Sequence, residues 1–163
     1  MYTPPNNYAF IDGSNLHLTY EHAHEHPNAK IDWRMDYRKL RRFLRKRFHI
    51  TVAYYFVGYR LRNSDIYKKL EEYGYVLMHE AANDLDAYLI KQAKWDIKKY
   101  DGAIIISSDQ HFAELVEYLD SRNKLKLVLA PCNDGCSGKL KKAANTKIEF
   151  LSDYKKELKK DEG

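Results

Sequence analysis

Three aspartates occupy positions where a parallel α/β sheet would gather its functional groups. Asp12 ends an apolar run that starts at Tyr8, Asp109 closely follows the apolar residues 103–106, and Asp86 lies in the first turn of a predicted helix. Ligands of open α/β sheets bind beyond the carboxyl ends of the strands, so neighbouring strands would bring these carboxylates into one pocket. Clustered carboxylates repel each other unless protons or a cation intervene, and Mg²⁺ accepts such ligands. The three residues therefore predict a divalent metal site.

Each aspartate also fits a purely structural role. Asp12 precedes Gly13 and fits a tight turn. Asp109 fits the cap of the helix that follows it, and Asp86 lies where an acidic side chain favours a helix N-terminus. Residue spacing alone leaves both interpretations open.

The elements that would position these residues alternate between strand and helix. We expect strands at residues 8–12, 51–57, 75–78, 103–106, 125–130 and 148–151. We expect helices from about Arg34, Ser64, Asn83, Ser108 and Ser137, and a polar loop or frayed helix end over residues 17–28. Because the central strands are apolar throughout, the pattern predicts an α/β fold of three layers, α/β/α. Its central sheet would be mainly parallel, with about five to six strands.

Length and composition describe one ordinary globular domain. The chain has 163 residues, of which 44% are hydrophobic and 31% charged. We expect a single domain over residues 1–163, with a core at about 8–151 and a charged C-terminal tail at 152–163. No apolar run approaches the roughly 18 residues of a membrane span, and the N-terminus lacks the pattern of a signal peptide. Two cysteines exclude a disulfide scaffold, so we expect a cytoplasmic protein without a membrane partner.

A strongly basic segment indicates a polyanionic partner. Residues 34–47 contain eight Lys or Arg and one Asp, within a chain of net charge +5. Tyr37, Leu40, Leu44 and Phe48 form one apolar stripe at helical spacing, so most of the basic side chains must face water. Two interpretations remain: a solvated helix face, or a surface that contacts RNA phosphates. The predicted RNA-backbone contacts are Arg38, Arg41, Arg42 and Arg45.

Two motifs, in this order, resemble those of a known family. Residues 10–16, FIDGSNL, are similar to the opening strand motif of NYN domains, the LabA-like branch of the PIN-like nucleases. Residues 100–112, YDGAIIISSDQHF, with Leu115, are similar to the family pattern DxAILISGDSDFxxL. Between them, Leu85, Asp86, Ala87 and Leu89 resemble the family's helix start. The resemblance spans residues 8–151.

This resemblance implies a PIN-like fold and a metal-dependent ribonuclease. Asp12, Asp86 and Asp109 match family acids that bind Mg²⁺ or Mn²⁺, and the metal activates water to attack an RNA phosphodiester. Asn15 matches the family asparagine and would position substrate or water, as would Ser108. His111 would serve as an auxiliary ligand, an acid or a base.

The sequence departs from the family pattern at three acid positions. His111 replaces the second acid of the GDSD motif, Gln92 stands six residues after Asp86, and Asn145 follows Ala144 where an acid is common. Fewer carboxylates would bind metal more weakly.

Three hypotheses about function follow. The first is an endoribonuclease that hydrolyses RNA phosphodiesters with a carboxylate-held divalent cation. The second is a catalytically impaired RNA-binding or protein-interaction module on the same fold. The third is a metal-dependent phosphohydrolase of small molecules, which would leave the basic segment without a role. The oligomeric state stays open, and a homo-oligomer is compatible with the sequence.

Overall fold

A computed structural model describes residues 2–21, 31–58, 65–80 and 84–161. Six strands are present in these ranges: β1 (Asn7–Asp12), β2 (Ile50–Gly58), β3 (Tyr75–Glu80), β4 (Gly102–Ile106), β5 (Leu125–Ala130) and β6 (Ile148–Phe150). The helices are α1 (Gly13–Glu21), α2 (Tyr37–Phe48), α3 (Asp65–Glu72), α4 (Leu85–Trp95), α5 (Ala113–Ser121), α6 (Gly138–Ala144) and α7 (Lys155–Leu158). Two 3₁₀ turns complete them: η3 (Gln110–Phe112) and η4 (Leu151–Tyr154).

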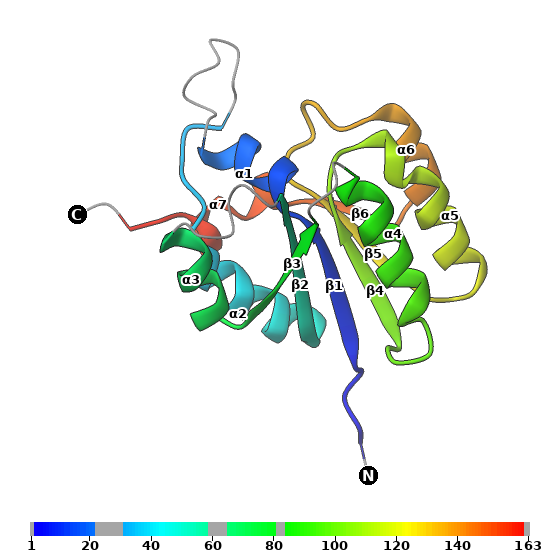
Figure 1. Ribbon diagram of the computed structural model, residues 1–163. Coiled ribbons are helices and arrows are strands. Elements are labelled where there is room, and N and C mark those ends of the chain that lie inside the picture. The colour runs from blue at the N-terminus through cyan, green and yellow to red at the C-terminus, as the bar shows by residue number, and fades with distance from the viewer. Residues whose placement is uncertain (1, 22–30, 59–64, 81–83, 162–163) are drawn as a thin grey trace.

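The sheet is entirely parallel, with strand order β3-β2-β1-β4-β5-β6. The chain builds outward from β1 to β3, then crosses back to place β4 on the other side of β1 (Figure 1). This reversal is the topological switch point, where open α/β sheets form their ligand crevice. It lies between β1 and β4, at their carboxyl ends.

Helices cover both faces of the sheet, which confirms the three-layer α/β/α prediction. Helices α1, α2, α3 and α7 pack on one face, and α4, α5 and α6 pack on the other (Figure 1). The all-apolar strand β4 explains this arrangement, because every one of its residues is buried. A strand of this kind needs a helix layer on each side.

Residues 17–21, which were predicted to belong to a polar loop or a frayed helix end, are helical. Helix α1 begins at Gly13, directly after the strand, and continues to Glu21. Its Leu16 and Tyr20 are one helical turn apart and buried in the core, and this packing outweighs the polar, His-rich composition. Residues 22–28, like Ser64 and Asn83, lie outside the described residues. The described N-cap of α4 is Asp84, whose carboxylate accepts a hydrogen bond from the Ala87 N–H.

The C-terminal segment, predicted as a charged tail, folds onto the basic helix. Leu158 of α7 is fully buried in the core beside α2. The Asp36 N–H donates to the Leu158 carbonyl at 2.8 Å, and the Lys160 N–H donates to the Arg34 carbonyl at 2.9 Å. A single leucine among charged residues gives no periodic signal, so the sequence did not indicate this packing.

Candidate metal centre

Asp12 ends β1 at the switch point and is half-buried. One carboxylate oxygen accepts a hydrogen bond from the Asn15 N–H at 3.1 Å, and the other accepts from the Ser107 hydroxyl at 3.0 Å. Burial raises the pKa of Asp12 from 3.8 to about 6, and the negative charges of Asp86 and Asp109 add to this rise. The two hydrogen bonds only partly oppose it. Asp12 is therefore a carboxylate whose ionised form is poorly compensated in the protein alone.

Two serines connect the end of β4 to the end of β1. Ser107 is fully buried, and its hydroxyl also accepts a hydrogen bond from the Asp109 N–H at 3.1 Å. The side-chain oxygen of Asn15 accepts from both the N–H and the hydroxyl of Ser108, each at 3.0 Å. These contacts fix the loop that carries Asp109 against the start of α1.

Asp86, Asp109 and His111 form a tight cluster of ligand atoms. One ligand atom from each side chain lies within 4.8 Å of the other two. His111 Nδ1 is 2.9 Å from the Asp109 carboxylate and 3.1 Å from that of Asp86. Asp109 also caps η3 by accepting from the His111 N–H. Asp12, at the end of β1, lies outside this 4.8 Å group, although the charges of Asp86 and Asp109 act on it.

The carboxylates of the cluster lack enough positive charge nearby to balance their own charges. Burial raises the pKa of Asp86, and the neighbouring carboxylate of Asp109 raises it further. The hydrogen bond with Asp109 raises the pKa of His111, with Asp86 contributing less. The imidazole of His111 lies between the two carboxylates, which favour its charged form, at the position where a metal ion would supply positive charge.

The donor set fits a divalent cation. Two carboxylates with one imidazole suit a transition metal such as Mn²⁺, while carboxylate oxygens alone suit Mg²⁺. The same residues that repel one another in the free protein would become ligands or ligand supports when a cation binds. Asp86, Asp109 and His111 are placed to hold it, and the charge of Asp12 acts on the same site.

Gly13 makes this edge of the sheet compact. A Cβ atom at this position would lie 2.5 Å from the backbone oxygen of Phe56 and 2.5 Å from the ring of Tyr55. The Tyr55 hydroxyl donates to the Gly13 carbonyl at 3.3 Å. Glycine therefore lets α1 start close against β2, which places Asn15 near Ser108.

Only one of the three departures from the family acids lies in the cluster. Gln92 donates to the Asp96 carboxylate at 2.9 Å, at the opposite end of α4 from Asp86. Asn145 is exposed at the C-terminal end of α6, a helix whose N-terminal Ser137 N–H donates to the Ser108 carbonyl. His111 is the substitution that changes the cluster itself.

The basic helix α2 lies away from this centre. Its buried residues are Tyr37, Leu40, Leu44 and Phe48, which confirms the predicted apolar stripe. Arg41 donates to the carbonyls of Gly74, Ile50 and Thr51, at the amino ends of β2 and β3. A six-residue strand such as β1 spans roughly 20 Å, which approximates the distance between the two ends of the sheet.

All four predicted RNA-backbone arginines line one cavity of about 430 Å³ between α2 and the end of α3. Arg38, Arg42 and Arg45 are exposed, whereas Arg41 is half-buried. The guanidinium of Arg41 donates hydrogen bonds to three backbone carbonyls, so this side chain has a structural role. An argument from charge alone could not reveal that role. RNA contact by Arg38, Arg42 and Arg45 stays a prediction.

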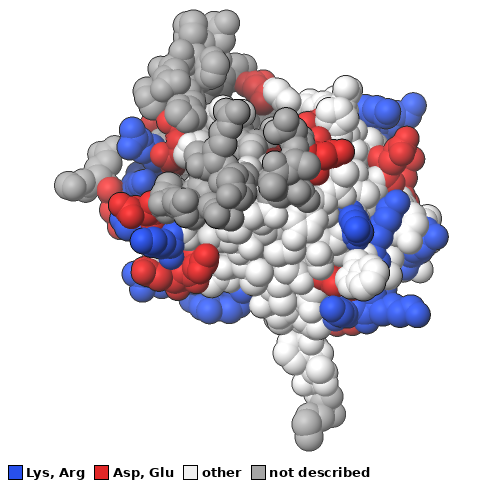
Figure 2. Space-filling model, in the orientation of Figure 1, with Lys and Arg blue, Asp and Glu red and all other residues white. Residues whose placement is uncertain are grey.

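Cys132 and Cys136 are free thiols. Across the described residues, every helix is too short or too polar to cross a bilayer. On the face that Figure 2 shows, Lys and Arg side chains gather at the two flanks, and the central region carries little charge.

The parallel sheet with carboxylates at its switch point defines an α/β protein with a candidate metal centre. The NYN domain matches residues 8–152, so the chain belongs to the NYN domain family of the PIN-like superfamily. Domains of this superfamily generally use divalent metals, and NYN domains typically bind RNA.

One solved structure supports the fold. It is a protein of unknown function from Vibrio parahaemolyticus RIMD 2210633, with a TM-score of 0.73 and 18% identity. The match covers 97% of this chain and 99% of that one. No curated protein matches the chain.

Proposed function

We propose that this NYN domain protein is a metal-dependent endoribonuclease. The observation that carries the proposal is the cluster of Asp86, Asp109 and His111 at the switch point of the sheet. The raised pKa of Asp12 beside it supports the same reading. Two acids held within reach of one ligand position, in a fold whose family typically binds RNA, support phosphodiester hydrolysis better than a structural role. The caps that Asp109 and Asp84 provide do not require Asp86 or Asp12 nearby.

The residues would divide the work as follows. Asp86, Asp109 and His111 hold the cation, and Asp12 supports them from β1. When bound, a divalent cation supplies a Lewis acid for the phosphoryl oxygens and lowers the pKa of a coordinated water. The family matches suggest Mg²⁺ or Mn²⁺, and the imidazole of His111 favours Mn²⁺.

Asn15 is the residue best placed to touch substrate or water. Its side-chain oxygen is occupied by Ser108, whereas its Nδ2 amino group has no acceptor within the described part of the chain. That group would donate to a phosphoryl oxygen or to the attacking water. Ser108 acts through Asn15, because its hydroxyl and N–H both orient the asparagine.

The test is cleavage of a 5′-labelled RNA of about 30 nucleotides with Mn²⁺, Mg²⁺ or EDTA. We expect cleavage with Mn²⁺, less with Mg²⁺ and none with EDTA. Asp109→Asn removes one ligand charge and should abolish cleavage. Glu117→Gln removes one exposed charge from α5 and serves as the matched control. Cleavage by Asp109→Asn at the rate of the control would contradict the proposal.

One observation favours a second candidate, the catalytically impaired binding module. His111, in place of an acid, lies between Asp86 and Asp109 and weakens the attraction for a cation. RNA binding without cleavage in any of the three conditions would favour this candidate. Hydrolysis of a small phosphate ester alone would favour the phosphohydrolase.

A further inference from the structure

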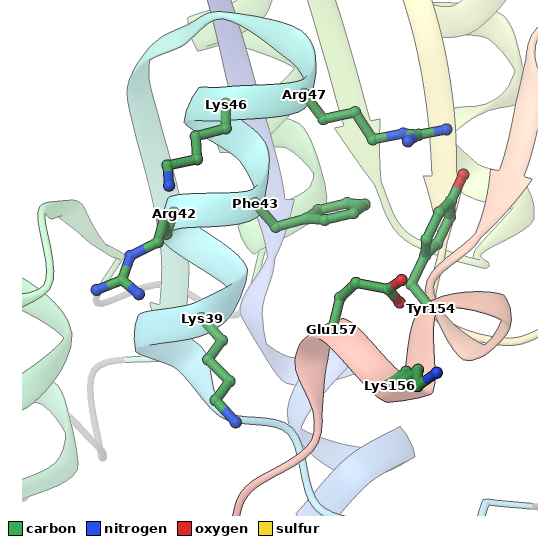
Figure 3. A pocket seen from close by; sticks show the side chains of 8 residues that line it. All are labelled: Lys39, Arg42, Phe43, Lys46, Arg47, Tyr154, Lys156 and Glu157. Atoms are coloured by element: carbon green, nitrogen blue, oxygen red, sulfur yellow. The ribbon is translucent and has the colours of Figure 1, made fainter.

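A second cavity, of about 570 Å³, lies between α2 and the C-terminal segment η4–α7. Lys39, Arg42, Phe43 and Lys46 line it from α2, while Tyr154 and Glu157 line it from the other wall (Figure 3). Its size falls within the range of small-molecule sites, roughly 300–1,000 Å³. It is separate from the metal centre, because its walls belong to the helix layer and contain none of the aspartates at the switch point.

The charge of this cavity is strongly positive. Five of its eight lining residues are Lys or Arg, and one is Glu. Lys39, Arg42 and Lys46 are spaced by three and four residues, so they share one side of α2 (Figure 3). Among the described residues, Arg42 and Lys46 form no ion pair or hydrogen bond, whereas Lys39 donates to Asp161 and to the Lys159 carbonyl. The side chains of Arg42 and Lys46, with Lys39 beside them, could therefore bind a phosphate group.

Aromatic rings form the other part of the lining. The rings of Phe43 and Tyr154 lie 4.9 Å apart between centroids at 57°, and both side chains are half-buried. Arg47 lies over the Tyr154 ring at 5.0 Å, and the Tyr154 hydroxyl donates to Glu149. The ring of Tyr154 is thereby held in place. A basic helix face that only maintained solubility would need no concave wall with fixed aromatic rings.

We propose that this cavity binds a nucleoside phosphate. The base lies against Phe43 and Tyr154, because base–aromatic stacking is available to every base. Lys39, Arg42 and Lys46 bind the phosphates. Glu157 is the single carboxylate of the lining, and as an acceptor it pairs with an N–H of the base edge. The ligand is either a free nucleotide or a 5′-terminal nucleotide of an RNA strand. This inference goes beyond the proposed nuclease activity and requires no cleavage.

The first experiment compares GDP with inorganic pyrophosphate by isothermal titration calorimetry, in EDTA and at low salt. Both probes carry a diphosphate, and only GDP carries a base. We expect GDP to bind at least about tenfold more tightly, which corresponds to the lower range of stacking contributions. Equal affinities for GDP and pyrophosphate, or no binding of either probe at millimolar concentration, would overturn the proposal.

Variants then test the two parts of the cavity separately. Phe43→Leu keeps apolar volume beside the core and should bring the affinity for GDP close to that for pyrophosphate. The double variant Arg42→Gln, Lys46→Gln should lower the affinity for both GDP and pyrophosphate by about tenfold or more. Arg38→Gln removes an exposed charge from the neighbouring cavity and is the matched control. Unchanged GDP binding by Phe43→Leu, with melting temperature preserved, would refute the base site.

The source of the nucleotide is resolved by a 5′-phosphorylated RNA pentamer. Tighter binding of the pentamer than of GDP, lost in Phe43→Leu, would assign the site to a strand end. Equal or weaker binding would assign it to a free nucleotide. Asp109→Asn should leave GDP affinity unchanged, so failure of the nuclease proposal is distinguishable from failure of this one.

Discussion

Replacing Asp12 with asparagine should stabilise the metal-free protein at alkaline pH. The folded-state pKa of about 6 lies above the ordinary value of 3.8, so the folded protein holds this carboxyl more favourably in its protonated form. The wild-type protein therefore loses stability as the pH rises from about 4 through 6. Asparagine has no charge to ionise and avoids this loss.

The size of the effect follows from the pKa difference. A shift of about two units corresponds to about 3 kcal/mol at a pH well above 6. Residual contact with water reduces this value, and the asparagine amide can replace only one of the acceptors that Asn15 and Ser107 use, which costs about 1 kcal/mol. The net gain at pH 8 is therefore about 1–2 kcal/mol. At pH 4.5 the difference should vanish or change sign.

Urea unfolding in EDTA at pH 4.5 and pH 8 measures this difference. Glu117→Gln controls for the general effect of removing one negative charge from a basic protein. The reasoning is refuted if Asp12→Asn is less stable than wild type at pH 8, or if the difference is the same at both pH values. In saturating Mn²⁺ the order should reverse, because a cation that binds the native state stabilises wild type more than the variant.

Three further predictions concern the surroundings of the centre and the basic helix. Asn15→Ala leaves two donors of Ser108 without their acceptor, so we expect a loss of about 1–2 kcal/mol in urea unfolding and a strong loss of RNA cleavage. Gly13→Ala forces a Cβ atom to 2.5 Å from a backbone oxygen of β2 and should destabilise the fold by about 2 kcal/mol or more, seen as a lower melting temperature. Arg41→Ala should lower the melting temperature, because it removes hydrogen bonds to backbone carbonyls. The double variant Arg38→Ala, Arg45→Ala should leave the melting temperature unchanged. It should reduce the slope of log affinity for RNA against log salt concentration by about 0.7 per lost contact, measured by fluorescence anisotropy. Unchanged slopes in the double variant would show that the side of α2 with Arg38 and Arg45 is only a solvated surface.

The strand positions could be predicted from the sequence because most strands are short apolar runs. All six strands were expected within two residues of their observed ends, and the α2 stripe of Leu40 and Leu44 was correctly oriented. Asp12 and Asp109 were expected at this edge because each follows an apolar run that predicts a buried strand.

The finer geometry of the site depends on side-chain contacts that spacing does not encode. Ser107 holds Asp12 and the Asp109 backbone, but a serine after an apolar strand is usual in a turn. Arg41 was grouped with its neighbours by charge, and only the carbonyl positions at the start of β2 reveal its different role. His111 was expected as an auxiliary residue, and its distances to both acids required the structure.

The hydrogen bonds at the switch point join parts of the chain that are synthesised far apart in time. Asn15 and Ser108 are separated by 93 residues, and Asp12 and Ser107 by 95. Contacts of such long sequence separation form late in folding, because the intervening loop entropy must be overcome first. A growing chain on the ribosome that has not yet produced β4 and the loop after it contains β1 without its neighbour and only part of the acidic cluster. The candidate metal centre is thus incomplete until the chain has been made through His111.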